Sequence, residues 1–429
     1  MSTRYRLSEE LHHRALRTIP LGTQTFSKSK TQYPYGVSPY FVARAQGSRV
    51  WDVDGNEYVD FINALASVTL GYNDPDVLAA VRAQLDQGTI FSLPHPLEVD
   101  VAEKIVEMVP CAECVRFGKN GSDATAGAIR LARAYTRRDR IAVCGYHGWQ
   151  DWYIGSTNRH LGVPRAVREL THTFTYNDVD SLHKLFRKYP DEFAAVILEP
   201  VNVVAPEQGF LEESQALTRK HGALLVFDEM ITGFRFAKGG AQEYFGVTPD
   251  LATFGKGLAN GYPVSALVGK AEYMQLLEDV FFSFTFGGET LSLAAALATL
   301  KKLQTQPVIE TIWRRGQSLV EGLSAIIGRL ALSNMVQLGG LPVWSFVIFN
   351  DVSPYTKHEL KTLYLQEMFQ RGVLTIGTHN MSYAHSEADV QRILAAYEEV
   401  FALLKGAVAS GRVHELLKCE PLVPLFQVR

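Results

Sequence analysis

Cysteine is scarce in this chain, with 4 in 429 residues, which excludes the dense disulfide framework of a small secreted domain. No apolar run approaches the roughly 18 residues that a membrane-spanning helix needs, and the polar segment 1–11 does not resemble a secretory signal. The 42 basic and 45 acidic residues nearly balance, which argues against a dedicated nucleic-acid-binding protein. These absences predict a soluble, cytoplasmic globular protein with no nucleic-acid and no membrane partner.

A metal site is not predicted either. Cys111 and Cys114 form one C-x-x-C pair, and no second pair of Cys or His follows at zinc-finger spacing. We expect two core cysteines at this position.

Apolar, strand-like runs alternate with amphipathic helices through the middle of the chain. The expected strands are 115–118, 141–144, 195–198 and 224–227, and the expected helices are 75–87, 97–109, 123–137, 179–188 and 212–221. Such alternation predicts crossover units and a mostly parallel sheet. In such sheets the ligand sites lie at the carboxyl ends of the strands.

The two flanks of the chain have a different pattern. The first 60 residues predict one helix, short strands at 41–45 and 49–53, and a hairpin turn at Asp54-Gly55. A long helical stretch follows residue 289 and runs to about residue 330, before further strands and helices. We therefore predict an α/β fold with a large central domain, 63–325, and a small α+β domain built from residues 1–62 and 326–429.

Two reactive side chains follow apolar runs at predicted strand ends. Asp228 follows the run 224–227, and a buried carboxylate there needs a cation or a hydrogen-bond partner. Lys256 stands between two glycines, which let the backbone turn tightly and let a bulky ligand approach. A desolvated lysine near other cations has a lowered pKa and becomes a nucleophile for carbonyl compounds. Each residue alone has an ordinary alternative, a strand-end acid or a solvated lysine, but the pair favours a reactive site.

Two glycine-containing turns follow other predicted strands. Gly121 and Ser122 open a helix, where backbone N–H groups and the positive end of the helix dipole favour a phosphate; a simple N-cap at Ser122 is the alternative. Tyr146 lies between Gly145 and Gly148, so its ring can lie flat on a planar ligand or can simply pack.

In their order and spacing, these segments resemble the pyridoxal-phosphate (PLP) enzymes of fold type I, and among them the class III aminotransferases. Within that class the chain is similar to the glutamate-1-semialdehyde 2,1-aminomutases. The resemblance extends from about residue 20 to residue 404. Its further motifs are WDVDGNEYVD at 51–60, LEPV at 198–201, FDEMITGFR at 227–235, GKG at 255–257 and AHS at 384–386.

The resemblance implies PLP as the cofactor and assigns the catalytic residues. Lys256 matches the lysine that forms a Schiff base with the cofactor, and Asp228 matches the acid that bonds the pyridine nitrogen. Tyr146 matches the aromatic residue that stacks on the ring. An acid on the pyridine nitrogen keeps the ring able to accept electrons, and the lysine amine then serves as general base.

The resemblance also implies the remaining cofactor contacts. Gly121 and Ser122 match the phosphate-binding turn, and His147 and Glu199 match positions near the cofactor. His147 is expected to support the site rather than to act as base, because the lysine already has that role. Thr285 matches a threonine that reaches the phosphate of the neighbouring subunit, which implies a homodimer with shared active sites.

The chain departs from the aminomutase pattern where that family holds its substrate. Thr25 and Lys28 stand where the family has a Ser and an Arg, and a lysine binds a carboxylate without the bidentate fork of arginine. Gly377 stands where the family has an acid near the substrate amine. The segment 156–164 is shorter than the gating loop of the aminomutases. Gly-Glu-Thr stands at 288–290, where that family commonly has Gly-Asn-Pro.

Four further residues are candidates for substrate contacts. His379 and Asn380 offer donors and acceptors that suit a hydroxyl-rich substrate. Arg235 is predicted either to pair with a substrate carboxylate or to form a surface salt bridge, and Trp149 either to line the substrate pocket or to pack.

These features predict an aminotransferase that moves an amino group from a small-molecule donor, glutamate, to a carbonyl acceptor. The acceptor is expected to be a keto-sugar or another non-standard carbonyl compound. Intramolecular amino transfer, as in the aminomutases, is the alternative, although a shortened lid and a missing acid make it harder to retain a diamino intermediate. A racemase and a non-catalytic relative are weaker alternatives, since a binding module needs no imine-forming lysine.

Overall fold

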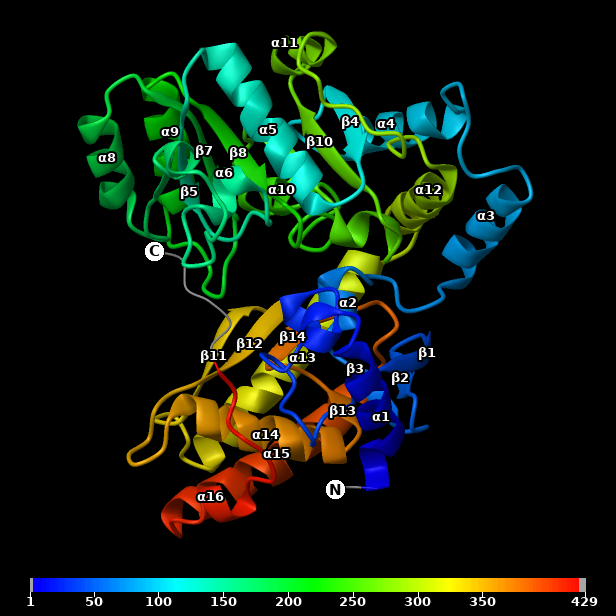
Figure 1. Cartoon of the computed structure of the whole chain (residues 1–429), viewed down its shortest axis with the longest axis vertical. Helices are drawn as coiled ribbons and strands as arrows, with labels where there is room; N and C mark the ends of the chain where they lie inside the picture. Colours follow the sequence, from blue (N-terminus) through cyan, green and yellow to red (C-terminus); the bar gives the residue numbers. More distant parts are fainter. Residues whose placement is uncertain (1–2, 424–429) are drawn as a thin grey trace. The chain divides into compact units, whose positions relative to one another are not determined.

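The computed structural model describes residues 3–423 and divides them into two compact units. Unit 1 comprises residues 3–65, 70–74 and 310–423, and unit 2 comprises residues 66–69 and 75–309. The ends of the predicted small domain, residues 1–2 and 424–429, lie outside the described residues. Figure 1 labels most of the helices and strands of both units.

Within the described residues, unit 2 is built around a seven-stranded sheet in the order β4-β10-β9-β8-β7-β5-β6. β10 is antiparallel to both of its neighbours, and the other pairs are parallel, so the predicted mostly parallel sheet is confirmed. The strands are β4 (Cys114–Gly118), β5 (Arg140–Cys144), β6 (Thr171–Thr173), β7 (Phe193–Leu198), β8 (Leu224–Asp228), β9 (Leu251–Phe254) and β10 (Ser265–Gly269).

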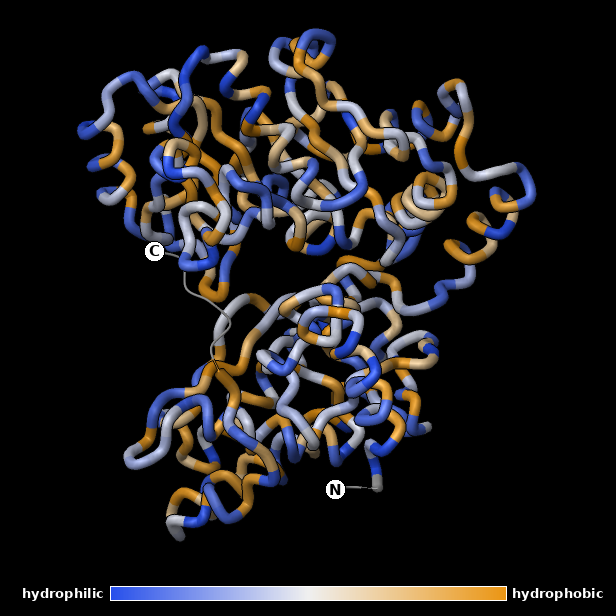
Figure 2. The backbone as a smooth tube through the Cα atoms, in the orientation of Figure 1, coloured by the Kyte–Doolittle hydropathy of each residue, from blue (hydrophilic) through white to orange (hydrophobic). Residues whose placement is uncertain are grey.

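The core of unit 2 lies between this sheet and the helix α5 (Gly121–Thr136), which crosses one face of the sheet in Figure 1. Alternate residues of β7 and β8 form one apolar cluster with Ala128 and Leu131 of the helix. Every residue of β7 is buried, as expected for a parallel strand that is covered on both faces. In Figure 2 the strands of this sheet carry much of the hydrophobic colouring.

The helices of unit 2 connect these strands. The predicted helix 179–188 matches α8 (Val179–Lys188), and the other predicted helices differ from the observed ones by a few residues at their ends. The remaining elements are α3 (Pro75–Leu85), α4 (Pro96–Met108), α6 (Asp151–Ile154), α7 (Arg165–Arg168), α9 (Phe210–Lys220), α10 (Ala241–Phe245), η4 (Lys256–Ala259), α11 (Ala271–Met274), η5 (Gln275–Glu278) and α12 (Thr290–Thr305).

The predicted helical stretch from 289 to about 330 is two helices, α12 and α13 (Val308–Arg329). They are separated at Pro307, because a proline lacks the backbone N–H and clashes with the preceding turn. Unit 2 ends at residue 309 among the described residues. The predicted domain boundary at residue 325 therefore lies inside α13, and the limits of independently folding domains stay a prediction.

Unit 1 contains two small sheets in the part of the chain that the structure describes. One has the order β1-β2-β3-β13 and the other β11-β12-β14. The predicted hairpin is confirmed, since β2 and β3 are antiparallel and the Asp52 carboxylate accepts hydrogen bonds from the backbone N–H groups of Asp54 and Asn56. The strands are β1 (Val42–Gln46), β2 (Arg49–Asp52), β3 (Glu57–Asp60), β11 (Val336–Leu341), β12 (Trp344–Phe349), β13 (Val373–Leu374) and β14 (Thr378–Asn380).

The helical elements of unit 1 are η1 (Thr3–Tyr5), α1 (Arg6–Ala15), η2 (Pro20–Gly22), η3 (Phe26–Lys28), α13, α14 (Lys357–Gln370), α15 (Glu387–Ala409) and α16 (Val413–Leu416). The short turn α2 (Asn63–Ala66) links the units and has positive φ angles throughout. None of the helices in the described range 3–423 has the length and apolar content of a membrane span.

Candidate active site

The carboxyl ends of neighbouring parallel strands carry the predicted cofactor residues of unit 2. Asp228 ends β8, and Lys256 follows β9, whose Thr253 is the pairing partner of Asp228. Glu199 follows β7, and Tyr146 follows β5 by two residues. The sheet order β9-β8-β7-β5 therefore brings these side chains to one edge, where ligand sites form in such sheets.

Asp228 and His147 form a buried pair at this edge. His147 Nδ1 lies 2.8 Å from Asp228 Oδ2, and His147 Nε2 lies 3.1 Å from the carbonyl oxygen of Cys144. A carbonyl oxygen can only accept, so Nε2 is the donor in the contact with Cys144. The backbone N–H of Met230 donates to the other oxygen, Asp228 Oδ1. These contacts fix the direction of the carboxyl group, in agreement with a supporting role for His147.

Glu199 is held beside Tyr146 by a backbone hydrogen bond. Glu199 Oε2 accepts from the backbone N–H of Tyr146 at 3.0 Å. Gly145 makes this approach possible, since it has a φ of +105° and a Cβ there would lie 2.4 Å from Glu199 Oε2. Burial raises the pKa of Glu199 to about 7, and the negative charge of Asp228 acts in the same direction.

We expect the stability of the cofactor-free enzyme to depend on the protonation of Glu199. Its pKa rises from an ordinary 4.5 to about 7 in the folded chain, so between these values the folded state binds more protons than the unfolded state. The free energy of unfolding therefore falls as the pH rises through this range. A Glu199→Gln variant stays neutral and lacks this contribution. In scanning calorimetry, the melting temperature of the variant minus that of the wild type should increase as the pH rises.

Glu192→Gln is the matched control for this experiment. Glu192 lies in the same unit, with a half-exposed side chain that pairs with Arg140 at 2.6 Å. Its replacement should not reproduce the trend. Equal differences in melting temperature between Glu199→Gln and the wild type at about pH 5 and about pH 8 would contradict the prediction.

Lys256 begins the short helix η4 and lies close to three charged groups. Burial lowers the pKa of the Lys256 ammonium below its ordinary value, and the positive charge of Arg235 adds to this effect. Glu199 and Asp228 act in the opposite direction. A lysine in this setting reaches the neutral, nucleophilic form more readily than an exposed lysine.

The turn at Gly121 and Ser122 forms the start of α5. Asn120, not Ser122, is the N-cap: its side chain accepts from the backbone N–H of Asp123, and Asp123 reciprocates in a capping box. The alternative that Ser122 is a simple N-cap is therefore wrong. Ser122 Oγ instead accepts from the backbone N–H of Trp149, and Gly148 permits this, since a Cβ there would lie 2.2 Å from that oxygen.

Arg235 is buried in unit 2, so the alternative of a surface salt bridge is wrong. Its guanidinium donates to the carbonyl oxygen of Ala66 at 3.0 Å and to the hydroxyl of Thr69 at 3.1 Å. Burial lowers the pKa of Arg235 to about 10. Contact between Arg235 and a substrate carboxylate stays a prediction.

Two predicted substrate residues lie in the N-terminal loop of unit 1. Thr25 caps η3 and accepts a hydrogen bond from the backbone N–H of Ser27. Lys28 ends η3 and lines a cavity of about 170 Å³ together with Asp60 and four tyrosines of the same unit. The cavity offers a positive charge, the carboxyl groups of Asp52 and Asp60, and phenol hydroxyls, and its role in substrate binding stays a prediction.

His379 and Asn380 lie in the core of unit 1, and this geometry speaks against the predicted contacts with a substrate. The two ring nitrogens of His379 contact the hydroxyls of Ser345 at 2.9 Å and Tyr397 at 2.7 Å. Burial lowers the pKa of His379 to about 3. Asn380 donates to the carbonyl oxygen of Ile62 at 2.6 Å, so its side chain fastens β14 to the end of β3.

The other predicted residues of unit 2 are accessible. Trp149 is 65% exposed and Tyr146 is 49% exposed, so part of each side chain is accessible to solvent. Thr285 lies in the exposed turn 285–288, which precedes α12.

Sequence reasoning missed two residues next to the site. Met230 lies between the phosphate turn and the lysine segment, since a Cβ on Gly121 or Gly255 would come within 3 Å of its sulfur. Lys119, directly before the turn, donates hydrogen bonds to Pro263, Glu289 and Ser292. The sequence holds no local signal for either contact, because the partners are distant along the chain.

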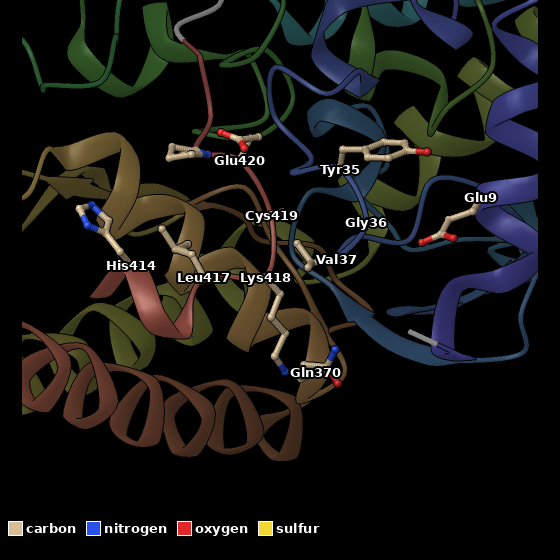
Figure 3. Close-up of a pocket in the computed structure, with 11 residues that line it drawn as sticks. Glu9, Tyr35, Gly36, Val37, Gln370, His414, Leu417, Lys418, Cys419 and Glu420 are labelled. Atoms are coloured by element: carbon tan, nitrogen blue, oxygen red, sulfur yellow. The ribbon is translucent and has the colours of Figure 1, made fainter. Parts of the chain in front are cut away.

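A larger cavity, of about 1010 Å³, lies in unit 1 (Figure 3). It is lined by the loop 35–37 and by residues 414 and 417–421, with Glu9 and Gln370. None of the predicted catalytic or cofactor residues lines this cavity. The strand ends of unit 2 are therefore the better candidate for the active site.

Comparison with known proteins identifies the class to which this fold and site belong. Residues 32–388 match the family described as aminotransferase class-III, and the chain belongs to that family. It is 35% identical over 408 residues to 3-aminobutyryl-CoA aminotransferase of Cloacimonas acidaminovorans, covering 93% of this chain and 97% of that one. It is also 35% identical over 429 aligned positions to glutamate-1-semialdehyde 2,1-aminomutase 2 of Geobacillus kaustophilus, covering 94% and 99%.

Solved structures place the chain among the PLP-dependent transferases of fold type I. The PLP internal aldimine form of the FumI protein of Sphingopyxis sp. MTA144 superposes with a TM-score of 0.88 at 32% identity, covering 97% of this chain and 100% of that one. Class III aminotransferases depend on PLP, so the cofactor of this enzyme is PLP. The predicted fold class, enzyme class and cofactor are thereby confirmed.

The donor set at the strand ends fits this cofactor. A buried lysine with a lowered pKa suits an aldehyde, and a carboxyl group fixed by His147 suits a ring nitrogen. Gly148 leaves room for Ser122 at the start of α5, where a phosphate is favoured.

Proposed function

We propose that this enzyme is a transaminase that takes the amino group of glutamate and transfers it to a carbonyl acceptor, with Lys256, Asp228 and Tyr146 as its catalytic residues. The observation that carries the proposal is the convergence of Lys256, Asp228 and Glu199 at adjacent strand ends. When bound, PLP supplies an electron-accepting ring that stabilises negative charge at the substrate carbon.

Each residue of unit 2 has a distinct role in this proposal. The Lys256 amine would hold the cofactor, and as a free amine it would accept the proton of the substrate carbon as general base. Asp228, oriented by His147, holds a proton at the pyridine nitrogen. Tyr146 covers the ring, and Gly121 and Ser122 bind the phosphate through their N–H groups at the start of α5.

Glu199 is proposed to keep a proton close to Lys256. Its pKa near 7 lets it gain or lose a proton at neutral pH. A protonated Glu199 leaves the charge of Asp228 as the principal negative charge next to the lysine. The lysine can then lose its proton more readily than it could beside two carboxylates.

We also propose that the active enzyme is a homodimer and that Thr285 reaches the cofactor phosphate of the partner. The turn that carries Thr285, together with the segment before it, exposes three aromatic side chains: Phe281, Phe284 and Phe286. Exposed apolar residues, Phe91 and Leu93, lie on the segment that adjoins α12 where the backbone N–H of Thr290 donates to the carbonyl oxygen of Thr89. Clustered apolar residues on a surface are typical of a protein interface.

The acceptor is proposed to be a carbonyl compound other than a common α-keto acid. Lys28, in place of an arginine, and Gly377, in place of an acid, support a substrate different from that of the aminomutases. The burial of His379 weakens the case for a keto-sugar. One relative is named for 3-aminobutyryl-CoA, a compound whose amino group is on carbon 3. An acceptor screen should therefore include 3-oxoacyl compounds as well as keto-sugars.

The visible absorption spectrum of the PLP-loaded enzyme tests the proposed donor. L-Glutamate should remove the absorption of the lysine-bound cofactor and release about one 2-oxoglutarate per subunit, because the first half of transamination consumes the carbonyl form of the cofactor. D-Glutamate at the same concentration is the control. The second half is followed by adding keto acids, keto-sugars and 3-oxoacyl compounds in turn.

Two results would contradict the proposal. An unchanged spectrum with L-glutamate would exclude it as donor. Conversion of glutamate-1-semialdehyde to 5-aminolevulinate without release of an oxo acid would favour the aminomutase alternative, which the similarity to aminomutases supports.

A further inference from the structure

Lys119 lies where three segments of unit 2 meet. Its ammonium donates hydrogen bonds to Glu289 Oε2 at 2.9 Å, to the carbonyl oxygen of Pro263 at 3.0 Å and to the hydroxyl of Ser292 at 3.3 Å. These contacts use the three donors that a lysine has.

Glu289 is held as firmly as its partner. It is the N-cap of α12, and its carboxylate accepts from the backbone N–H groups of Leu291 and Ser292. The Ser292 hydroxyl donates to the same oxygen as Lys119, at 2.6 Å. Burial raises the pKa of Glu289, but the hydrogen bonds from Ser292 and Lys119 outweigh it and leave that pKa below its ordinary value.

Each of the three segments leads to a cofactor residue of the proposed site. Lys119 directly precedes the turn of Asn120, Gly121 and Ser122. Pro263 lies at the end of the segment that begins with Lys256 and leads into β10. Glu289 closes the exposed turn that carries Thr285.

Lys119 and Glu289 form an ion pair between segments that lie 170 positions apart along the chain. The side chains of Lys119 and Glu289 are 21% and 18% exposed, so the pair is partly shielded from water. Such a pair couples its two segments more strongly than an exposed pair does, and removing one partner leaves a poorly solvated charge.

We propose that Lys119 is a positioning residue that, through Glu289 and Pro263, holds the phosphate-binding turn in register with the lysine segment and the Thr285 turn. The proposal rests on the phosphate contacts that the proposed function gives to Gly121 and Ser122. Lys119 acts on the cofactor through the backbone of that turn.

The test is the dissociation constant of PLP and of pyridoxal, which lacks the phosphate, for the full-length enzyme. Lys119→Met should weaken PLP binding about tenfold, an effect between those of exposed and buried ion pairs, and should leave pyridoxal binding unchanged. Glu289→Gln keeps an amide oxygen that can cap the helix and should show the same selective loss. The double variant should lose no more than either single variant, since the two residues form one unit.

Lys104→Met is the matched control. Lys104 lies in α4 of the same unit, its side chain is also 21% exposed, and it pairs with Glu107 at 2.5 Å. This variant should bind both ligands like the wild type. Circular dichroism and melting temperature identify any variant that fails to fold, and Glu289→Gln keeps the test decisive if Lys119→Met does not fold.

Three outcomes bear on the proposal. A selective loss of PLP affinity in both single variants supports it. Wild-type affinity for PLP, or an equal loss for PLP and pyridoxal, overturns it. If the wild type itself binds PLP and pyridoxal equally well, the phosphate contacts of the proposed function are wrong and this inference falls with them; failure of glutamate as donor leaves the inference intact.

Discussion

Replacing Lys256 with alanine should abolish transamination. The variant loses the amine that attaches the cofactor and also the base that moves the substrate proton, and the base role alone contributes roughly 10²- to 10⁴-fold. The rate of 2-oxoglutarate formation from L-glutamate measures the loss. The absorption of the lysine-bound cofactor should be absent in the same sample.

Lys238→Ala is the control for the loss of a lysine from unit 2. Lys238 is partly buried and donates to the carbonyl oxygen of Gln304 in the last turn of α12, at 3.3 Å. Its replacement should leave turnover within about twofold of wild type, as for most substitutions outside a site. Turnover retained by Lys256→Ala would show that another group provides the catalysis, and the proposed mechanism would be abandoned.

Replacing Asp228 with alanine should give the second largest loss. The carboxyl group is fixed by His147 and by the backbone N–H of Met230, and preorganised charges of this kind contribute about 10²- to 10³-fold to a rate. We expect turnover to fall by at least about 10²-fold. The loss should appear in kcat measured at saturating PLP, because the proposed role is electronic rather than one of cofactor retention.

Asp228→Ala also leaves His147 buried without its partner, so a second variant is needed to separate rate from stability. Asp228→Asn keeps the volume and one oxygen but cannot hold the negative charge. It should lose nearly as much activity as Asp228→Ala while melting closer to the wild type. Asp250→Asn is the control, since Asp250 is also buried and accepts from the backbone N–H of Leu225 at 2.8 Å in the same sheet. Wild-type kcat in Asp228→Asn would exclude the proposed bond to the pyridine nitrogen.

The central sheet could be predicted because its inner strands are continuous apolar runs. β7 and β8 are buried along their length, so the pattern has a strong signal. The sequence pattern does not predict β6, since it is three residues long, polar, and lies at the edge of the sheet. It does not predict the antiparallel inner strand β10 either. The break between α12 and α13 was also missed, although Pro307 marks it. A short edge strand depends on its neighbours more than on its own residues, and this information is not local.

The candidate site residues that the sequence predicts are those at the ends of apolar runs or within family motifs. Lys256 and Asp228 follow apolar runs, and the resemblance supplied their expected roles. Contacts between distant segments could not be predicted: Lys119 and Glu289 are separated by 170 positions along the chain. The polarity of His379 predicts a contact with the substrate, but its partners, Ser345 and Tyr397, come from other elements, and the side chain is buried in the core.

The strand ends of unit 2 have a consequence for how such enzymes diverge. Five side chains lie at the ends of different strands of one sheet: Asp228 ends β8, and Lys119, Tyr146, Glu199 and Lys256 follow β4, β5, β7 and β9. β5, β7, β8 and β9 are paired on both sides, whereas β4 lies at the edge of the sheet. A strand that is paired on both sides keeps its place when the loop beyond it changes in length or sequence, so one group can be moved while the others keep their positions. Relatives that share this fold are named for intermolecular transfer in one case and for isomerisation in another. New substrates can therefore evolve one loop at a time, without disturbing the groups at the other strand ends.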